Sequence, residues 1–185
     1  MQIISTGIEG LVEIVPAVFH DNRGWFYEFF KQSAFEAAGI KESFTQENIS
    51  FSRKGVIRGM HFQLPPYEQA KLVSVLQGAV LDAVVDLRSN SPTFGRVHTC
   101  LLTAEKHNML MVPAGFAHGF AALEDTIFIY KTTSQYHPAS EQGVRWNDPQ
   151  LNISWPFDNP LLSEKDRNLP TLAELLEKSV ISRVK

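Results

Sequence analysis

The chain has 185 residues, which is long enough to bury a substantial core. It contains one cysteine and carries a formal net charge of −3. The lone Cys100 argues against a disulfide framework and fits a reducing cytoplasm, and the N-terminus lacks the pattern of a signal peptide. The acidic balance gives no reason to expect nucleic acid or an anionic membrane as a partner, and no apolar run approaches the roughly 20 residues that span a bilayer.

The apolar runs are short and are separated by Gly, Pro, Asn and Ser, which is the rhythm of an all-β domain. Runs of strand length that follow one another this closely favour a sandwich or a closed barrel. The sequence contains no repeat and no interdomain linker, so residues 1–185 are predicted to form a single domain. The predicted strands are Leu72–Gln77, Val80–Leu87, Val97–Leu102, Met109–Val112, Gly119–Leu123 and Ile127–Thr133.

Two helices and a hairpin are predicted outside this β core. Ser33–Glu36 has the capping-box pattern, and Gly39 is suited to end the helix that it opens. Thr171–Glu174 has the same pattern and opens a helix to about Lys178. Asp21–Gly24 predicts a turn into a strand, for which a solvated hairpin is the default interpretation.

One motif points to a cavity that contains histidines. Pro113–His118 fits the second half of a pattern with which small β-barrels of the cupin type bind a metal, and the first half would be His-x-His followed by Glu. Here the first half reads His61-Phe62-Gln63, so the second histidine is missing. Because a first-row metal needs several imidazole and carboxylate ligands at one point, the pattern predicts acid–base chemistry without a metal.

The strand around the first histidine has two different faces. Residues two apart in a strand share a face, so His61 and Gln63 are predicted to face a cavity, while Met60 and Phe62 face a core or a barrel wall. Gly59 would allow another backbone to approach closely. A hydrogen-bonded histidine and glutamine on an exposed sheet face is an equally weighted alternative.

Two further segments carry groups that are suited to proton transfer. Tyr130 and Tyr136 are an even number of residues apart and would share a face of a continuous strand, where a phenol can donate a proton to a carbanion. Two half-buried strand tyrosines are the plainer interpretation. Ser163–Asp166 is either a charged turn or the carrier of a carboxylate that orients a histidine.

Taken together, these segments resemble the dTDP-4-dehydrorhamnose 3,5-epimerase family, the RmlC-like cupins of deoxysugar biosynthesis. The resemblance runs from about Val15 to about Asp166, and so many matches in order are far more specific than any single motif. Its markers are Asp21-Asn22-Arg23-Gly24, Gln46-Glu47-Asn48, Arg58–Gln63, Gln69–Val73, Asp86-Leu87-Arg88, Ser91–Gly95, Pro113–Phe120, Trp146-Asn147-Asp148, Trp155-Pro156 and Ser163–Asp166.

The resemblance implies an all-β, cupin-type jelly-roll barrel with short peripheral helices, a homodimer that exchanges N-terminal strands, and no metal or other cofactor. It implies a dTDP-linked 4-keto-6-deoxyhexose as substrate. By the same resemblance His61 is the base, Tyr130 the acid and Asp166 the partner of His61. Tyr136 stacks on the thymine, and Arg23 and Glu28 serve a neighbouring subunit's site. The residues placed around the sugar and nucleotide are Arg23, Glu28, Gln46, Glu47, Asn48, Arg58, Lys71, His118, Tyr136, Glu141 and Lys165.

These residue types suit an epimerisation beside a ketone. Proton removal at C3 or C5 of a 4-ketosugar gives an enolate whose charge lies largely on the C4 oxygen. A histidine with a pKa near 6.5 can act as the base, and Lys71 is our candidate for the cation that stabilises the enolate oxygen. Tyr130 would return a proton from the opposite face, with Tyr136 or water as the alternative acid. The diphosphate needs local cations, for which Arg58, Arg23 and Lys165 are the candidates.

Several competing functions remain open at this level. An epimerase that acts at only C3 or only C5 is the nearest enzymatic rival, and a 3,4-ketoisomerase is a third. A sugar-binding or structural cupin is the rival without catalysis, but it predicts the loss of His61, Tyr130 or Asp166, and all three are present. Gln63 disfavours a metal-dependent cupin dioxygenase or isomerase.

Overall fold

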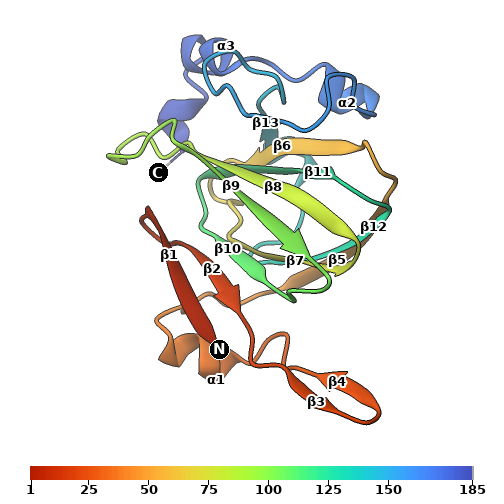
Figure 1. The fold of residues 1–185 in the computed structure, drawn as a ribbon. Coiled ribbons are helices and arrows are strands. Elements are labelled where there is room, and N and C mark those ends of the chain that lie inside the picture. Colours follow the sequence, from red (N-terminus) through yellow and green to blue (C-terminus); the bar gives the residue numbers. More distant parts are fainter. Residues whose placement is uncertain (185) are drawn as a thin grey trace.

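The structure is a computed structural model that describes residues 1–184, and its core is a pair of β-sheets that face each other (Figure 1). The six-stranded sheet has the order β1 (Gln2–Ile8), β2 (Leu11–Val15), β10 (Met109–Val112), β7 (Lys71–Gln77), β12 (Thr126–Thr132) and β5 (Gln46–Ser52). The five-stranded sheet has the order β13 (Glu141–Gly143), β6 (Ile57–Gln63), β11 (Phe116–Ala122), β8 (Ala79–Asp86) and β9 (Val97–Thr103).

From β5 to β13 the chain crosses between the two sheets at every connection except the one from β8 to β9. All pairings between named strands are antiparallel. Repeated crossing between two antiparallel sheets is the winding of a jelly roll. The all-β, cupin-type jelly-roll prediction is therefore confirmed.

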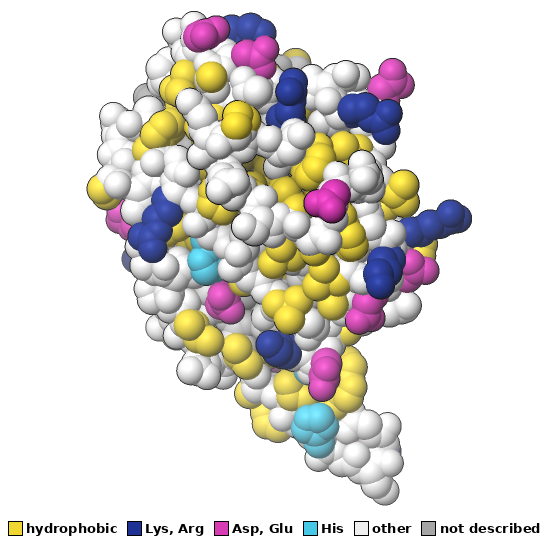
Figure 2. All heavy atoms as spheres, turned by 45° about the horizontal axis from the view of Figure 1, so that its top comes forward, with side chains coloured by type: hydrophobic (Ala, Val, Ile, Leu, Met, Phe, Trp, Pro, Cys, Tyr) yellow, Lys and Arg dark blue, Asp and Glu magenta, His cyan; other side chains and the backbone are white. Residues whose placement is uncertain are grey.

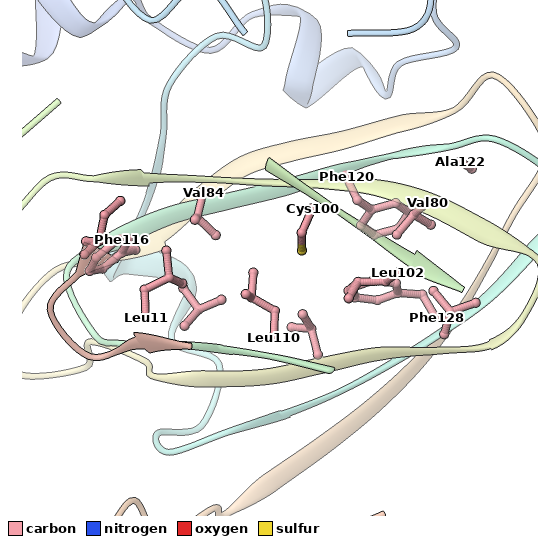
Figure 3. Close-up of a cluster of buried hydrophobic side chains, with 14 residues drawn as sticks. Leu11, Val80, Val84, Cys100, Leu102, Leu110, Phe116, Phe120, Ala122 and Phe128 are labelled. Carbon is pink, nitrogen blue, oxygen red and sulfur yellow. The ribbon is translucent and has the colours of Figure 1, made fainter. Parts of the chain in front are cut away.

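Apolar side chains from both sheets fill the space between them. Phe116 and Phe128 are almost fully buried there, with Leu102 and Leu110 between them (Figure 3). Each sheet also buries part of its outer face, because helices and loops pack against it. Burial on both faces explains why Met109–Val112 is apolar throughout instead of alternating with polar residues.

Short helices lie outside the sheets: α1 (Gln32–Ala37), α2 (Glu164–Arg167) and α3 (Leu172–Glu177), together with the 3-10 turns η1 (Pro138–Ser140) and η2 (Ile181–Arg183). The Thr171 capping box that opens α3 is confirmed, since both of its hydrogen bonds form. The Ser33 cap is wrong, because the cap of α1 is Lys31, two residues earlier, and Lys31 makes no side-chain hydrogen bond. Gly39 follows the end of α1 with φ of +87°, as a helix-terminating glycine does.

The predicted strands exist, with two corrections. The strand predicted at 119–123 runs over Phe116–Ala122 instead, so His118 lies within β11 and not before it. Tyr136 does not continue the strand of Tyr130, because β12 ends at Thr132 and the chain then turns into a loop. The two tyrosines therefore do not share a strand face as predicted, although the fold still brings both to one cavity.

The predicted hairpin is confirmed and projects from the main body as β3 (Phe19–Asp21) and β4 (Gly24–Phe26) (Figure 1). Figure 2 shows the main body tapering to a narrow projection, with acidic and basic side chains interspersed over the visible face. Within residues 1–184, no helix combines the length and the apolar character needed to cross a membrane.

Candidate active site

A cavity of about 310 Å³ lies at one end of the barrel and is lined by side chains from both sheets. Strands β6, β7, β11 and β12 contribute to its wall, and α2 and the segments around η1 close one side of it. The cavity gathers most of the predicted site residues, namely Arg58, His61, Lys71, His118, Tyr130, Tyr136, Glu141, Lys165 and Asp166.

His61 on β6 forms a close pair with Asp166 on α2. The distance from His61 Nε2 to Asp166 Oδ1 is 2.6 Å, and Asp166 is only 4% exposed. Ser163 caps α2 by accepting a hydrogen bond from the Asp166 backbone N–H at 3.0 Å, which fixes the start of the helix that carries the carboxylate.

The Asp166 carboxyl remains ionised at neutral pH. Burial by itself raises its pKa, but hydrogen bonds from His61, the Ser163 hydroxyl and the Gly59 backbone N–H outweigh burial and lower the pKa below its usual range. A carboxylate only accepts hydrogen bonds, so His61 Nε2 carries the shared proton. The other ring nitrogen, Nδ1, is then the basic atom of a neutral His61.

Gly59 lets the strand of His61 approach the strand of His118. A Cβ atom at Gly59 would lie 2.5 Å from the Gly119 Cα atom, and the residue has φ of +128°. This close approach places His61 directly opposite His118 in the pairing of β6 with β11. The expected role of Gly59 is confirmed, and its consequence is that the two histidines are neighbours.

His118 has a carboxylate partner of its own, Asp82 on β8, which our sequence reasoning missed. Its Nε2 atom lies 2.8 Å from Asp82 Oδ2, and both residues are buried. The second carboxylate oxygen of Asp82 is buried without a hydrogen-bond partner among the described residues. The available signal was an acidic residue inside an apolar, β-branched strand, because a buried charge requires a partner.

Lys71 on β7 is the buried cation of the cavity. Its burial lowers its pKa to about 8, although the charges of Asp82 and Glu141 act in the opposite direction. Its Nζ atom lies 3.4 Å from the His61 carbonyl oxygen. Near neutral pH Lys71 is therefore largely protonated and lies beside the strand that carries His61.

Tyr130 on β12 lines the cavity with its phenol half-buried against the apolar core. Burial raises the pKa of Tyr130, the charge of Glu141 adds to this, and Arg58 opposes it. Arg58 is held in place because its guanidinium donates to Ser52 Oγ at 2.9 Å and to the Phe51 carbonyl at 3.0 Å. The phenol therefore keeps its proton at neutral pH.

Tyr136, Glu141 and Lys165 form a polar chain at the mouth of the cavity. The Tyr136 hydroxyl donates to Glu141 Oε2 at 2.5 Å, and the Lys165 ammonium donates to the same oxygen. Burial raises the pKa of Glu141, but the hydrogen bonds from Lys165 and Tyr136 lower it overall. Tyr136 is 51% exposed, so its ring is available to a ligand that enters the cavity.

Gln63 holds together the two loops that border the mouth. Its amide nitrogen donates to the Tyr67 carbonyl at 2.5 Å and to the Gln135 carbonyl at 3.3 Å, and its amide oxygen accepts from the His137 N–H at 2.8 Å. The residue at the position of the missing histidine therefore uses both ends of its side chain to position the loop that carries Tyr136.

Strand β5 divides the predicted residues Gln46, Glu47 and Asn48 between its two faces. Gln46 donates to Asn48 Oδ1 at 2.9 Å and accepts from the Tyr136 backbone N–H at 2.9 Å, so these two side chains lie beside the cavity mouth. Glu47 points to the opposite face and pairs with Lys131. The structure therefore does not bring Glu47 to the cavity, because neighbouring residues of a strand alternate between its faces.

Arg23 and Glu28 also lie away from the cavity of their own chain. Arg23 is at the tip of the projecting hairpin, 85% exposed at its side chain, and pairs with Asp21 at 2.6 Å. Glu28 pairs with Lys31 at 3.2 Å. Neither residue lines the cavity that contains His61.

The geometry supplies the parts of a proton-transfer site. It offers a histidine backed by an ionised carboxylate, a phenol that keeps its proton, and a buried ammonium, all facing one cavity. A base, an acid and a cation in one enclosed space can remove a proton beside a carbonyl, stabilise the resulting enolate and return a proton.

Comparison with known proteins agrees with this chemistry. The family model described as dTDP-4-dehydrorhamnose 3,5-epimerase matches residues 5–174. The chain is 49% identical to the dTDP-4-dehydrorhamnose 3,5-epimerase of Escherichia coli K12, over 98% of this chain and 100% of that one. It is 41% identical to the dTDP-4-dehydrorhamnose 3-epimerase of Streptomyces niveus, over 94% of this chain and 85% of that one.

A solved structure gives the same result. The dTDP-6-deoxy-D-glucose-3,5-epimerase of Legionella pneumophila, in complex with dTDP-4-keto-L-rhamnose, superimposes with a TM-score of 0.89 and 44% identity over 93% of each chain. A family match over nearly the whole chain, together with close relatives of the same length, decides membership. The protein belongs to the dTDP-4-dehydrorhamnose 3,5-epimerase family.

Proposed function

We propose that this protein is a dTDP-4-dehydrorhamnose 3,5-epimerase. It converts dTDP-4-dehydro-6-deoxy-D-glucose to dTDP-4-dehydro-L-rhamnose, in dTDP-L-rhamnose biosynthesis, by exchanging the protons at C3 and C5. The observation that carries the proposal is the His61–Asp166 pair, which faces the same cavity as the protonated phenol of Tyr130.

His61 acts as the base in this proposal. Both reacting carbons are adjacent to the C4 ketone, so removal of either proton gives an enolate. Nδ1 of His61 accepts the proton, because Nε2 is committed to Asp166 at 2.6 Å. The ionised Asp166 stabilises the imidazolium that results and holds the ring in one tautomer.

Tyr130 and Lys71 complete the transfer. Tyr130 delivers a proton to the opposite face of the enolate, which inverts the carbon, and Tyr136 or water is the alternative donor. Lys71 stabilises the negative C4 oxygen as it forms. A preorganised donor of this kind lowers the activation barrier by about 3 kcal/mol in known cases. His118, held by Asp82 at 2.8 Å, contacts the sugar.

The nucleotide lies at the mouth of the cavity in this proposal. Arg58 and Lys165 neutralise the diphosphate, and the exposed ring of Tyr136 stacks on the thymine. Gln46 and Asn48 border the same mouth, and Gln46 fixes the backbone of Tyr136 at 2.9 Å. Glu141 orients both Tyr136 and Lys165 through the hydrogen bonds that it accepts.

We also propose that residues 1–185 form one domain that assembles as a cytoplasmic homodimer with exchanged N-terminal strands. The projecting hairpin supports this, because it exposes Phe19, Trp25 and Phe26 at 63%, 58% and 64%. Arg23 and Glu28 then complete the partner's cavity. A mixture of the His61→Ala and Arg23→Ala variants tests it: the mixed dimer regains activity, whereas two independent sites would leave the mixture inactive.

The direct test is incubation with dTDP-4-keto-6-deoxyglucose in deuterated water, followed by NMR. The proposal expects deuterium at both C3 and C5 and formation of the L-rhamno product. The His61→Ala variant is expected to lose exchange at both positions. Substantial exchange in that variant would remove His61 as the base, and no exchange in the unmodified protein would favour the sugar-binding alternative.

A single-site epimerase is the second candidate. The relative from Streptomyces niveus, whose name specifies a 3-epimerase, supports it, because the chain resembles that protein over 94% of its length. The same labelling experiment separates the two activities. One labelled carbon selects the single-site enzyme, and two select the double epimerase.

A further inference from the structure

A cluster of three potential metal ligands lies outside the catalytic cavity. Glu13 on β2 and His98 and Cys100 on β9 each offer one ligand atom, and these atoms all lie within 4.8 Å of one another. It is the only such group of three or more His, Cys, Asp or Glu side chains among residues 1–184. None of the three lines the cavity that contains His61.

The strand registers explain why these side chains converge. Glu13 lies opposite Leu110 in the pairing of β2 with β10, and Leu110 is buried between the sheets. Cys100 lies opposite Asp82 in the pairing of β9 with β8, and both are buried. Figure 3 shows the Cys100 thiol directed into the gap between the sheets, toward Leu110. The cluster therefore joins one sheet to the other.

His98 supplies the observation that points to a ligand. Its Nε2 atom is buried and has no hydrogen-bond partner among the described residues. The nearest acid, Glu13 Oε1, lies at 3.6 Å, which is too long for a hydrogen bond. A buried polar nitrogen without a partner costs free energy, and coordination to a cation would remove that cost.

The charges around Cys100 also favour a cation. The buried Asp82 lies opposite Cys100 in the strand pairing, and a carboxylate oxygen of Glu13 lies within 4.8 Å of the thiol sulfur. A divalent metal adds positive charge beside these carboxylates, displaces the thiol proton into solvent and forms a metal–thiolate bond. The thiolate and the Glu13 carboxylate then neutralise the two positive charges of the metal.

We propose that Glu13, His98 and Cys100 bind a divalent metal of the zinc class, with water as a fourth ligand. Zinc accepts this mixture of carboxylate, imidazole and thiolate donors in tetrahedral geometry. Ligands in such a site are about 3.3–3.8 Å apart, given zinc–ligand distances of about 2.0–2.3 Å. The 3.6 Å between Glu13 Oε1 and His98 Nε2 already fits this range, and because all three ligand atoms lie within 4.8 Å of one another, no pair needs to close by more than roughly 1.5 Å.

The metal would act as a clip between the sheets and not as a participant in proton transfer. Strands β2 and β9 belong to different sheets and share no backbone pairing. A ligand that binds only the folded protein stabilises it. The proposal therefore expects zinc to raise the thermal midpoint while the metal-free protein keeps its epimerase activity.

Cobalt titration of the full-length, metal-free protein tests the proposal. The chain has one cysteine, so a sulfur-to-cobalt charge-transfer band in the near ultraviolet can arise only from Cys100. We expect a band that saturates at one cobalt per chain and disappears when zinc is added. Cys100→Ala abolishes it, and His98→Gln and Glu13→Gln each weaken cobalt binding at least tenfold.

Controls separate this site from other metal-binding groups and from misfolding. His20→Gln, at an exposed histidine on the hairpin, is expected to leave the band unchanged. Circular dichroism and the epimerase assay check that each variant folds. Absence of the band, or a band that survives both His98→Gln and Glu13→Gln unchanged, overturns the proposal. So does an equal rise in thermal midpoint with zinc in the Cys100→Ala variant.

Discussion

Replacement of Asp166 by Asn is the sharpest test of the proposed base. The substitution keeps the size and shape of the side chain but removes the charge that lies 2.6 Å from His61 Nε2. Asparagine can still accept through its carbonyl oxygen, so a hydrogen bond to the ring remains possible. It no longer stabilises an imidazolium, and its NH₂ group can also bind the opposite histidine tautomer.

The expected loss follows from the strength of this ion pair. Two unit charges about 4 Å apart interact by about 4 kcal/mol at an effective dielectric constant near 20. The His61 side chain is 28% exposed, so solvent screens part of this interaction. We therefore expect a loss of roughly 2–4 kcal/mol in transition-state stabilisation, which corresponds to a fall in kcat between about 30-fold and about 1000-fold.

The assay is the rate of deuterium incorporation at C3 and C5, measured by NMR on purified Asp166→Asn. Asp148→Asn is the matched control, because Asp148 is a carboxylate of similar burial outside the cavity. It accepts from the backbone N–H groups of Gln150, Leu151 and Leu172 at 2.8–3.0 Å. Its variant is expected to lose stability but to keep kcat when folded.

A folded Asp166→Asn variant whose kcat lies within about threefold of the unmodified protein would contradict this assignment. Such a result would mean that the charge behind His61 does not matter in the transition state. An equal loss in folded Asp148→Asn would mean that the effect reports general destabilisation instead.

Three further predictions concern other parts of the cavity. The pKa of Lys71 is about 8 and only its protonated form is a cation, so kcat/KM should fall as pH rises through about 8. Lys71→Arg should move that fall to higher pH, because arginine keeps its charge. A pH profile that does not move contradicts the role assigned to Lys71. Gln63→Leu leaves the Tyr67 carbonyl and the His137 N–H without their hydrogen-bond partner, so it should raise KM more than it lowers kcat. A change confined to kcat would argue that Gln63 does not position these loops. Gly59→Ala should lower the free energy of unfolding by roughly 3 kcal/mol or more in urea titrations, since its Cβ would lie 2.5 Å from the Gly119 Cα. Gly24→Ala is the control, because Gly24 also has a positive φ but open space around it, and it should lose less stability. Equal losses in the two variants would mean that the backbone angle, and not the close approach, causes the effect.

Local pattern was sufficient for much of the fold. Short apolar runs between glycines and prolines predicted the strands between Leu72 and Thr133, and the capping box at Thr171 predicted α3. Both signals depend on neighbouring residues, which is why they can be read along the chain. The error at Ser33 arose because a capping pattern indicates only a preference, and the helix is capped by Lys31, two residues earlier.

Contacts between distant segments explain what sequence reasoning missed. Asp82 looked like an interruption in a strand, and its pairing with His118, 36 residues away, depends on the register of β8 with β11. Gln63 looked like a lost metal ligand, and its role in joining two loops depends on residues up to 74 positions away. Glu47 stood within a family motif, but alternation along β5 turns it away from the cavity.

Composition and short-range spacing were enough to predict the all-β class, the strands between Leu72 and Thr133 and most of the reactive side chains. Which of those side chains meet depends on how the two sheets pack. His61 and Asp166 are 105 residues apart, and the packing of α2 at the mouth of the barrel places them 2.6 Å from each other. Such a distance is a property of the packed sheets, since no local preference of either segment specifies it.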